Sequence, residues 1–485
     1  MSTFFVHNFG CRATQADGAA LERDLIGRGL IHAISARDAE VVVLNTCTVT
    51  AEADRDVRAA IRRTHRENPG CRILVTGCYA QRAPHELEGL PGVSWVVGNS
   101  HKHQIGEIIN ITCHPERSAS EQTGVPGKPG FGLLGWGSER ARVEGPVFPV
   151  EALVSTYVGD IFAHTELLAA PVFDGLGYDK TRPNLKVQDG CDNRCSFCII
   201  PFVRGQSRSL RRDDVLREMD ALLAAGFREV VISGINLGRW GRDLDPAGRF
   251  EELVRAILDH TGVERLRLSS IEPMDWTDEL IELVAGSPRV ARHAHVPLQT
   301  GSDRVLRRMH RKYRPWHYED RIRKIRLAMP MAAIGADVMV GFPGETDAEF
   351  EENRRFIASL PFTYLHVFTY SPRPGTPAAE MAQQVAPQIK RERNRVLREL
   401  AAGKKTAFMQ SLVGQTVSTI TLSVGENGRT ESLTDNYQKL WLEGRHAANQ
   451  IVSAQVREVA DHSLMGLSLG AATTGLPDAP DRPMS

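Results

Sequence analysis

Three cysteines, Cys191, Cys195 and Cys198, form a C-x3-C-x2-C pattern directly after a short extended run, 184–189, that Gly190 ends. A loop of this spacing can direct three thiolates at one point, and thiolates bind iron–sulfur clusters and zinc. The pattern therefore favours a cluster held by three cysteines, which leaves one metal position unfilled. Two alternatives remain. One is a zinc ion completed by a remote ligand, because structural zinc sites are four-coordinate; the other is thiols without a shared role.

A second set of cysteines, Cys11, Cys47 and Cys78, is spread along the first part of the chain. Each follows an expected strand by one to three residues, in the runs VHNFGC, VVLNTC and LVTGC. Ligands of open parallel α/β sheets bind outside the carboxyl ends of the strands, so three strands would deliver three thiolates to one rim. The alternative is three independent core cysteines. Cys71 starts its strand, and we expect it to be a structural thiol at the opposite end.

The elements that would position these cysteines alternate between strands and helices. Residues 1–111 contain four apolar runs separated by helical patterns, which predicts an open parallel α/β domain. The expected strands are 4–8, 40–45, 71–76 and 93–97, and the expected helices are 15–28 and 52–66. Residues 112–150 are rich in Gly, Pro, Ser and charge, which predicts a disordered insertion, and 151–176 are expected to be a connector.

Residues 177–406 repeat the alternation in six strand–helix units, which predicts a partial (β/α)6 barrel. Its expected strands are 185–188, 229–233, 265–269, 293–296, 333–340 and 364–368. Polar and glycine residues recur along the rim at the strand ends, where they could approach and orient a cofactor, although a glycine-rich loop by itself is more often only a turn. These candidate pocket residues are Gly234, Asn236, Ser269, Glu272, Gln299 and Asp337.

The C-terminal part and the composition limit which partners the protein is expected to have. Short strand patterns in 407–470 predict a small β-barrel, and 471–485 should be a disordered tail. Lys+Arg and Asp+Glu both total 59, so a nucleic-acid surface would have to be local. Two basic runs, 304–326 and 390–405, are candidates, with solvated helix faces as the alternative. The sequence shows no signal peptide and no apolar run near the roughly 18 residues that a membrane span needs. We therefore expect a cytoplasmic protein without a membrane role. In that compartment its cysteines are expected to bind metal rather than form disulfides.

Longer motifs resemble the radical S-adenosylmethionine (radical SAM) methylthiotransferase family. The central matches are KVQDGCDNRCSFCIIPFVRGQSRS, HVPLQTGSDRVLRRMHRKY, GADVMVGFPGET and FTYSPRPGTPA. The runs FGCRATQAD, NTCTVT and TGCYAQ resemble the N-terminal domain of the family, and the last two are most like the branch that acts on N6-threonylcarbamoyladenosine in tRNA. The run LTDNYQKLWLEG resembles a TRAM domain, an RNA-binding β-barrel.

The resemblance implies the chemistry of each site. Cys191, Cys195 and Cys198 would hold a 4Fe–4S cluster whose open iron binds SAM and generates a 5′-deoxyadenosyl radical at adenosine 37 of tRNA. Cys11, Cys47 and Cys78 would hold a second 4Fe–4S cluster that carries the inserted sulfur. The candidate pocket residues on the rim would line the SAM site. A monomer, tRNA as the partner, and an electron donor such as flavodoxin or ferredoxin are also implied.

Other functions stay open on this reasoning. The same reaction could modify another tRNA adenosine, such as isopentenyladenosine, or a ribosomal protein residue, although the NTCTVT run argues against the protein substrate. A protein of a different class, a non-catalytic RNA-binding protein that contains iron–sulfur or zinc, would show the same cysteine patterns. Formation of 5′-deoxyadenosine separates the enzymes from this last alternative.

Overall fold

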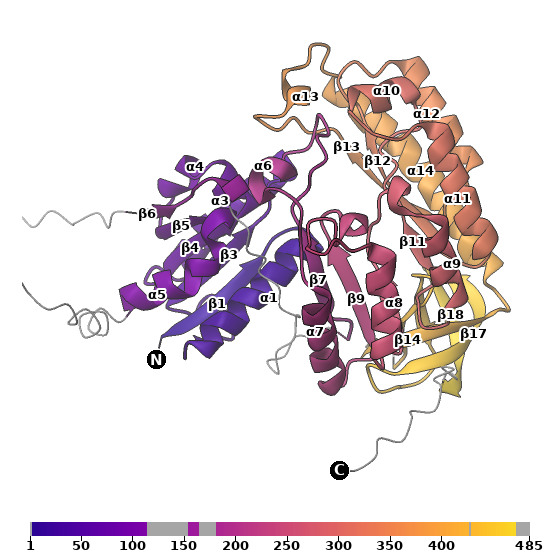
Figure 1. Cartoon of the computed structure of the whole chain (residues 1–485), viewed down its shortest axis with the longest axis horizontal. Coiled ribbons are helices and arrows are strands. Elements are labelled where there is room, and N and C mark those ends of the chain that lie inside the picture. Colours follow the sequence, from indigo (N-terminus) through magenta and orange to yellow (C-terminus); the bar gives the residue numbers. More distant parts are fainter. Residues whose placement is uncertain (1, 114–153, 164–180, 426–427, 472–485) are drawn as a thin grey trace, which may run out of the picture.

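The computed structural model describes residues 2–113, 154–163, 181–425 and 428–471. Most of the expected insertion and tail lies outside this range. The N-terminal part stands to one side of a central arc of strands, and the C-terminal part lies below that arc (Figure 1). Among the described residues, no helix has both the length and the hydropathy that crossing a membrane would require.

The N-terminal part is a parallel sheet with helices on both faces, as expected. The strand order is β2-β1-β3-β4-β5-β6. The strands are β1 (Thr3–Asn8), β2 (Ile31–His32), β3 (Val41–Thr46), β4 (Arg72–Gly77), β5 (Val93–Gly98) and β6 (Ser155–Tyr157). The helices are α1 (Arg12–Gly27), α2 (Ala51–Glu67), α3 (Cys78–Arg82), α4 (His85–Glu88), η1 (Asn99–Gln104) and α5 (Ile105–Cys113).

The central strand β3 explains the continuous apolar run that predicted it. Val41 and Val43 pack into one hydrophobic cluster, while Val42 and Leu44 pack into another. Alternate side chains of a strand point to opposite faces, so both faces of this sheet are covered. One difference from the expected organisation lies in the connector: its residues 155–157 form strand β6, which pairs in parallel with β5 at the edge of the sheet.

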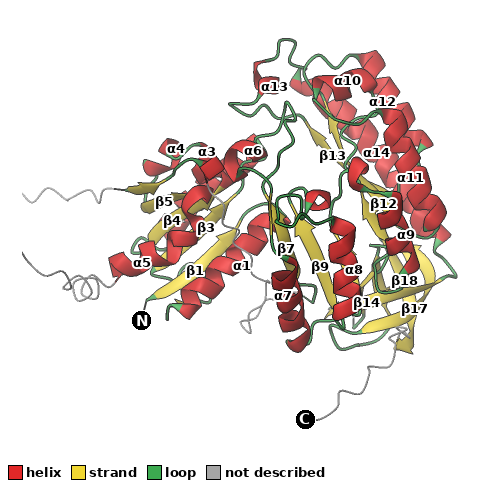
Figure 2. Ribbon diagram, viewed as in Figure 1, coloured by secondary structure: helices red, strands yellow, loops and turns green. Residues whose placement is uncertain are grey.

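The central part is the expected partial barrel (Figure 2). A sheet of order β10-β9-β7-β8 and a sheet of order β11-β12-β13 meet where Leu266 bridges Val290 and the Ile271 N–H donates to the His295 carbonyl at 3.1 Å. The strands are β7 (Asn184–Asp189), β8 (Arg208–Ser209), β9 (Glu229–Gly234), β10 (Arg265–Leu268), β11 (His293–His295), β12 (Ala333–Val340) and β13 (Tyr364–Thr369). Only the short edge strand β8 is antiparallel to its neighbour in these two sheets.

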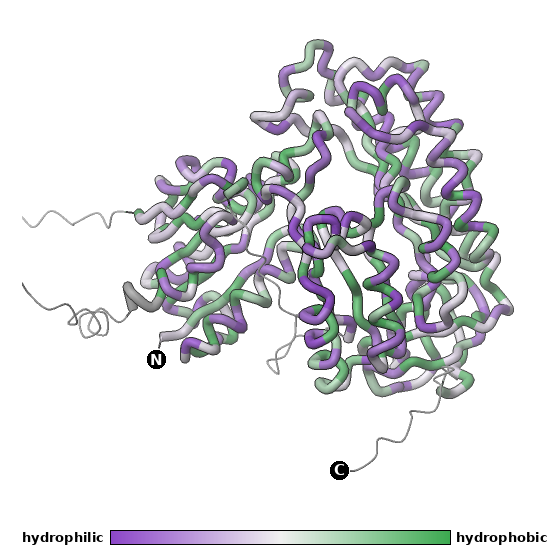
Figure 3. The backbone as a smooth tube through the Cα atoms, in the orientation of Figure 1, coloured by the Kyte–Doolittle hydropathy of each residue, from purple (hydrophilic) through white to green (hydrophobic). Residues whose placement is uncertain are grey.

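Helices cover the outer side of this arc, where hydrophilic and hydrophobic residues are interspersed along the chain (Figure 3). The helices of the central part are η2 (Ile161–Ala163), α6 (Ile200–Arg204), α7 (Arg212–Ala224), η3 (Leu237–Arg239), α8 (Phe250–His260), η4 (Pro273–Asp275), α9 (Asp278–Gly286), α10 (Asp303–Arg308), α11 (Pro315–Ala328), α12 (Asp347–Ser359), α13 (Pro377–Glu380) and α14 (Pro387–Ser411). Together with the strands they enclose the largest hydrophobic core of the described chain.

Alternation along the central strands separates an apolar outer side from a polar inner side, which we call the concave face. Residues such as Ile232, Ala294 and Val338 belong to the core beneath the helices. Their strand neighbours point the other way and are mostly polar; they include Lys186, Gln188, Glu229, Arg267, His295, Asp337 and His366. Helix α1 lies against β7 on this side. The β13 side is open, since the His366 side chain is 59% exposed.

The C-terminal part is a closed barrel of order β14-β15-β16-β18-β17. Its strands are β14 (Thr416–Val424), β15 (Thr430–Thr434), β16 (Lys439–Leu442), β17 (Ile451–Ala460) and β18 (Ser463–Ala471). It docks at the N-terminal ends of the central strands, where Arg267 donates to the carbonyls of Thr434 and Asp435 at 3.1 and 3.0 Å. The Tyr437 ring lies 4.5 Å from the His293 ring. One end of the partial barrel is thereby closed, and the end with the cysteine loop stays free.

A buried ion network joins the N-terminal and central parts. Asp17 of α1 accepts from Lys102 and Arg204 at 3.0 Å each and also pairs with Lys186. Lys186 and Arg204 in turn contact Asp189, both at 3.0 Å. Burial alone would raise the pKa of the Asp17 carboxyl, but the three cations hold this pKa well below its ordinary value. Asp17 is therefore a charged anchor between the two parts.

We expect Asp17→Asn to destabilise the protein by about 3–5 kcal/mol, because it leaves buried cations without their carboxylate. Urea unfolding measures this loss, and Asp24→Asn, which breaks a partly exposed pair with Arg28, should change stability by less than about 1 kcal/mol. The folded pKa of Asp17 is depressed, so its stabilisation is present above the unfolded pKa and is lost as pH falls. The difference between wild type and Asp17→Asn should therefore narrow in acid. Equal losses of stability in Asp17→Asn and Asp24→Asn would contradict the role of Asp17 as an anchor.

Candidate functional site

The C-x3-C-x2-C loop leaves the carboxyl end of β7 and leads into α6. Gly190 adopts φ +71°, and a side chain there would collide with the carbonyl oxygen of Gln206. The Cys191 N–H donates to the Gly205 carbonyl at 3.1 Å, and the Cys198 N–H donates to the Cys195 carbonyl at 3.1 Å. The loop is thus folded by its own backbone and presents its sulfur atoms at the free end of the partial barrel.

Two side chains donate to sulfur atoms of this loop. Asn236 Nδ2 lies 3.6 Å from Cys191 Sγ, and Arg311 Nη1 lies 3.2 Å from Cys195 Sγ. Arg311 also forms an ion pair with Glu272. Burial would lower the pKa of the Arg311 guanidinium, but Tyr313, Glu272 and Cys195 hold this pKa well above its ordinary value. Donors of this kind stabilise a thiolate, which is the form that binds metal.

The predicted pocket residues separate into two groups. Asn236 lines a cavity of about 260 Å³, and Glu272 lines a smaller one that also includes Cys195 and Arg311. The remaining four lie on the rim or concave face of other strands. Gly234 ends β9 against the Gln188 side chain, the Ser269 N–H donates to the Ile232 carbonyl, and the Gln299 N–H donates to the Asp337 carbonyl at 2.8 Å. All six lie on strands β9 to β12 or in the loops that follow them, and their role with SAM stays a prediction.

The second cysteine set lies at the carboxyl ends of β1, β3 and β4. Cys11 is the exposed N-cap of α1, Cys47 is buried just after β3, and Cys78 is the buried first residue of α3. Burial is the largest cause that raises the pKa of the Cys47 thiol to about 12, and the neighbouring Cys78 and Cys11 thiols raise it further. The three side chains are therefore close enough to affect one another. Cys71 is buried just before β4, at the opposite end of the sheet.

The donor chemistry of both cysteine sets suits a cluster. Each set offers three thiols, and thiolates are the ligands of iron–sulfur clusters as well as of zinc. A 4Fe–4S cluster at either set would be held by three cysteines and would keep one iron without a protein ligand.

Residues of the two cysteine sets and their neighbours contact one another. Cys78 packs against Ile199, which follows Cys198 directly in the chain, and against Val203 of α6. Asn99 Nδ2 donates to the Val203 carbonyl at 2.7 Å and lies 3.6 Å from Cys78 Sγ. A second contact comes from the loop after β13, where Arg373 donates to Thr48, the residue after Cys47, at 2.8 Å. The fold thus packs Cys78 of one set against the segment that directly follows the C-x3-C-x2-C loop of the other.

The two basic runs are largely engaged within the protein. In the first, 304–326, seven of the ten Lys and Arg side chains form ion pairs with acidic side chains. In the second, Arg393 pairs with Glu345 and Asp347, and Lys404 donates to main-chain carbonyls. For both runs, we therefore favour the interpretation that these side chains form helix faces and structural contacts, rather than a phosphate-binding surface.

Comparison with known proteins identifies the family. Residues 185–357 match the Radical SAM superfamily, and residues 3–98 match the family described as Uncharacterized protein family UPF0004. The threonylcarbamoyladenosine tRNA methylthiotransferase MtaB of Bacillus subtilis is 35% identical over 448 residues, 92% of this chain and 91% of its own length. The MtaB of Aquifex aeolicus is 34% identical over 91% of this chain and 97% of its own length.

A relative with another substrate in its name is equally similar. The tRNA-2-methylthio-N(6)-dimethylallyladenosine synthase of Parafrankia is 35% identical over 91% of this chain and 82% of its own length. Among solved structures, the radical SAM methyltransferase TsrM of Kitasatospora setae shares the fold, with a TM-score of 0.52, 16% identity, and coverage of 78% of this chain and 74% of that one. The motif, the fold and these relatives agree, and the chain belongs to the family of radical SAM tRNA methylthiotransferases, which use SAM and a 4Fe–4S cluster.

Proposed function

We propose that this protein methylthiolates carbon 2 of N6-threonylcarbamoyladenosine at position 37 of tRNA, with two 4Fe–4S clusters. The observation that carries the proposal is the pair of three-cysteine sites, one at the carboxyl ends of β1, β3 and β4 and the other in the loop between β7 and α6. Each site offers three thiols, so each cluster would keep one open iron, one for SAM and one for the transferred sulfur. The MtaB relatives in Bacillus and Aquifex support the substrate.

The residues at both sites fit clusters. Burial raises the pKa of the Cys191 thiol to about 11 and that of Cys198 to about 12, so these thiols hold protons until metal displaces them. The bound cofactors supply the radical chemistry, and the protein supplies orientation and a sheltered site. Asn236 and Arg311 donate to the sulfurs of the loop, and such hydrogen bonds raise the reduction potential of a bound cluster.

The open side of the concave face suits entry of a nucleotide. Phe368 and His366 of β13 are exposed there, and an adenine turned out of its RNA stack could contact both. The C-terminal barrel at the other end would hold the tRNA. We propose that the protein acts as a cytoplasmic monomer, and that a flavodoxin or ferredoxin supplies the electron.

A second candidate is the same reaction on dimethylallyladenosine, the isopentenyl-type base named for the Parafrankia relative. Mass spectrometry of tRNA nucleosides from a strain that lacks the gene decides between the two. We expect 2-methylthio-threonylcarbamoyladenosine to disappear and its precursor to accumulate, with the dimethylallyl product unchanged. Loss of the dimethylallyl product instead would establish the second candidate. If neither product changes, both assignments fail. The wild-type gene should restore the product, and a gene encoding Cys198→Ala should not.

A further inference from the structure

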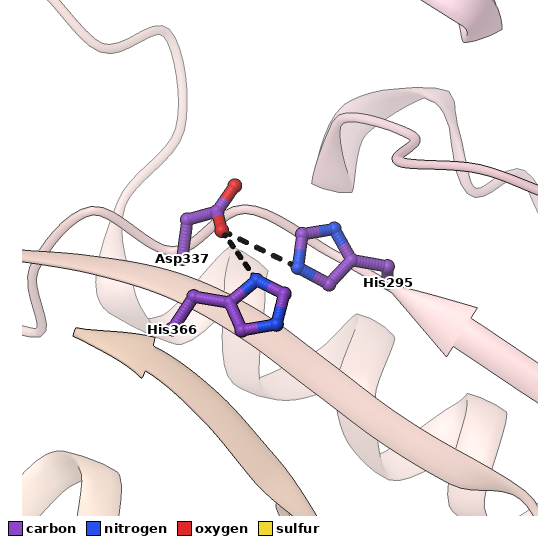
Figure 4. A group of neighbouring side chains, drawn as sticks. All are labelled: His295, Asp337 and His366. Atoms are coloured by element: carbon purple, nitrogen blue, oxygen red, sulfur yellow. Dashed lines mark hydrogen bonds and ion pairs between the residues drawn. The ribbon is translucent and has the colours of Figure 1, made fainter. Parts of the chain in front are cut away.

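Two histidines and an aspartate meet on the concave face, on strands other than β7, which leads into the cysteine loop. His295, Asp337 and His366 come from the adjacent strands β11, β12 and β13 (Figure 4). Their nearest nitrogen and oxygen atoms all lie within 4.8 Å of one another. Asp337 Oδ1 is 3.4 Å from His295 Nε2 and 3.3 Å from His366 Nδ1. The register explains the meeting, because Asp337 pairs with His366 across the sheet.

The environment of His295 indicates which of its nitrogens faces Asp337. His295 is only 6% exposed, and its Nδ1 lies 2.7 Å from the hydroxyl oxygen of Ser270. Its Nε2 makes no hydrogen bond within the described structure and is directed at the Asp337 carboxylate. If Nδ1 carries the hydrogen and donates it to Ser270, two acceptors face each other across 3.4 Å. A histidine that is oriented by such a partner and presents its other nitrogen is typical of metal ligands.

We propose that His295, Asp337 and His366 bind one zinc-class divalent transition-metal ion, whose remaining coordination position opens onto the concave face. Two imidazoles and one carboxylate suit zinc and neighbouring first-row ions. Three protein ligands leave a fourth position for water or a ligand, as in zinc sites that act on substrates. The exposed side chain of His366 marks the side on which that position is accessible.

The ligand class follows from the chemistry of the ion, and this step rests on the proposed function. A divalent ion with an open position binds a carboxylate oxygen in exchange for water. The threonylcarbamoyl group carries a carboxylate, whereas an isopentenyl group is a hydrocarbon with no oxygen to offer. The metal would therefore select the carboxylate-bearing base and hold it on the concave face that the cysteine loop adjoins.

Metal content tests the site. The protein is first reconstituted with iron and sulfide, so that the cysteines are occupied, and is then equilibrated with buffered zinc; zinc and iron are measured together. We expect one zinc per chain in wild type and in His317→Ala, a surface-histidine control. His366→Ala and Asp337→Asn should bind zinc at least about tenfold more weakly at unchanged iron content. Absence of zinc from wild type, or equal zinc in His366→Ala, would overturn the site.

RNA binding tests the ligand. We expect zinc to tighten binding of an anticodon stem-loop with threonylcarbamoyladenosine by about tenfold, which is about 1.4 kcal/mol, and to leave a stem-loop with plain adenosine unchanged. His366→Ala should lose the zinc effect. Zinc binding without this preference would overturn the carboxylate assignment. Full-rate methylthiolation by zinc-free protein would overturn the zinc inference and leave the proposed function standing. If zinc selects the modified stem-loop but no methylthio product forms, the proposed function would fail and the zinc inference would stand.

Discussion

Cys198→Ala is expected to abolish release of 5′-deoxyadenosine from SAM. Two remaining thiolates cannot hold a cluster that needs three protein ligands, and without the cluster SAM receives no electron. The measurement is chromatography with mass detection after incubation of reduced, reconstituted protein with SAM. Cys71→Ala is the matched control, because Cys71 is a buried cysteine at the opposite end of the N-terminal sheet, and it should retain the activity. Undiminished 5′-deoxyadenosine from Cys198→Ala would remove the radical assignment from this loop.

Cys11→Ala is expected to separate the two halves of the reaction. SAM cleavage should continue, methylthio product should fall below detection, and iron content should drop by about half, since one of two clusters is lost. Cys11 is the best choice in its set, because it is exposed and its side chain does not cap α1 by a hydrogen bond, so little stability depends on it. Nucleoside analysis of a modified tRNA substrate measures the product. Normal methylthiolation by this variant would contradict the two-cluster proposal.

Much of the fold could be predicted, because its long strands are buried on both faces or alternate clearly. The run around Val41–Thr46 is apolar throughout and forms the centre of a covered sheet. Strands β2, β6 and β8 were not predicted, and β15 and β18 were not among the strands expected in the C-terminal part, which were 416–423, 437–442 and 451–459. β2 and β6 have two and three residues, too few to show a period. β15 and β18 are rich in Ser, Thr and Gly, and they form strands because their neighbours close a barrel.

The positions of the candidate ligands were predictable where these residues follow a local pattern, and less so where partners come from distant strands. All six candidate cluster cysteines lie at the expected strand ends, in two sets. Arg311 was not singled out, because within a basic run nothing marks the one guanidinium that turns inward to Cys195. His295 and His366 also carried no signal, since they lie 71 residues apart and meet only through sheet register. Tertiary packing alone creates such groups.

The buried anchor at Asp17 and the Arg373 contact limit how the enzyme can work through a catalytic cycle. Parting the N-terminal and central units would strip charged groups of their partners, a cost that ordinary binding energy covers poorly. The two units should therefore move as one rigid body and should not hinge apart. The cysteine at Cys78 and the helix that follows the C-x3-C-x2-C loop are in contact across this joint, so the two cysteine sets should keep the same separation throughout the reaction.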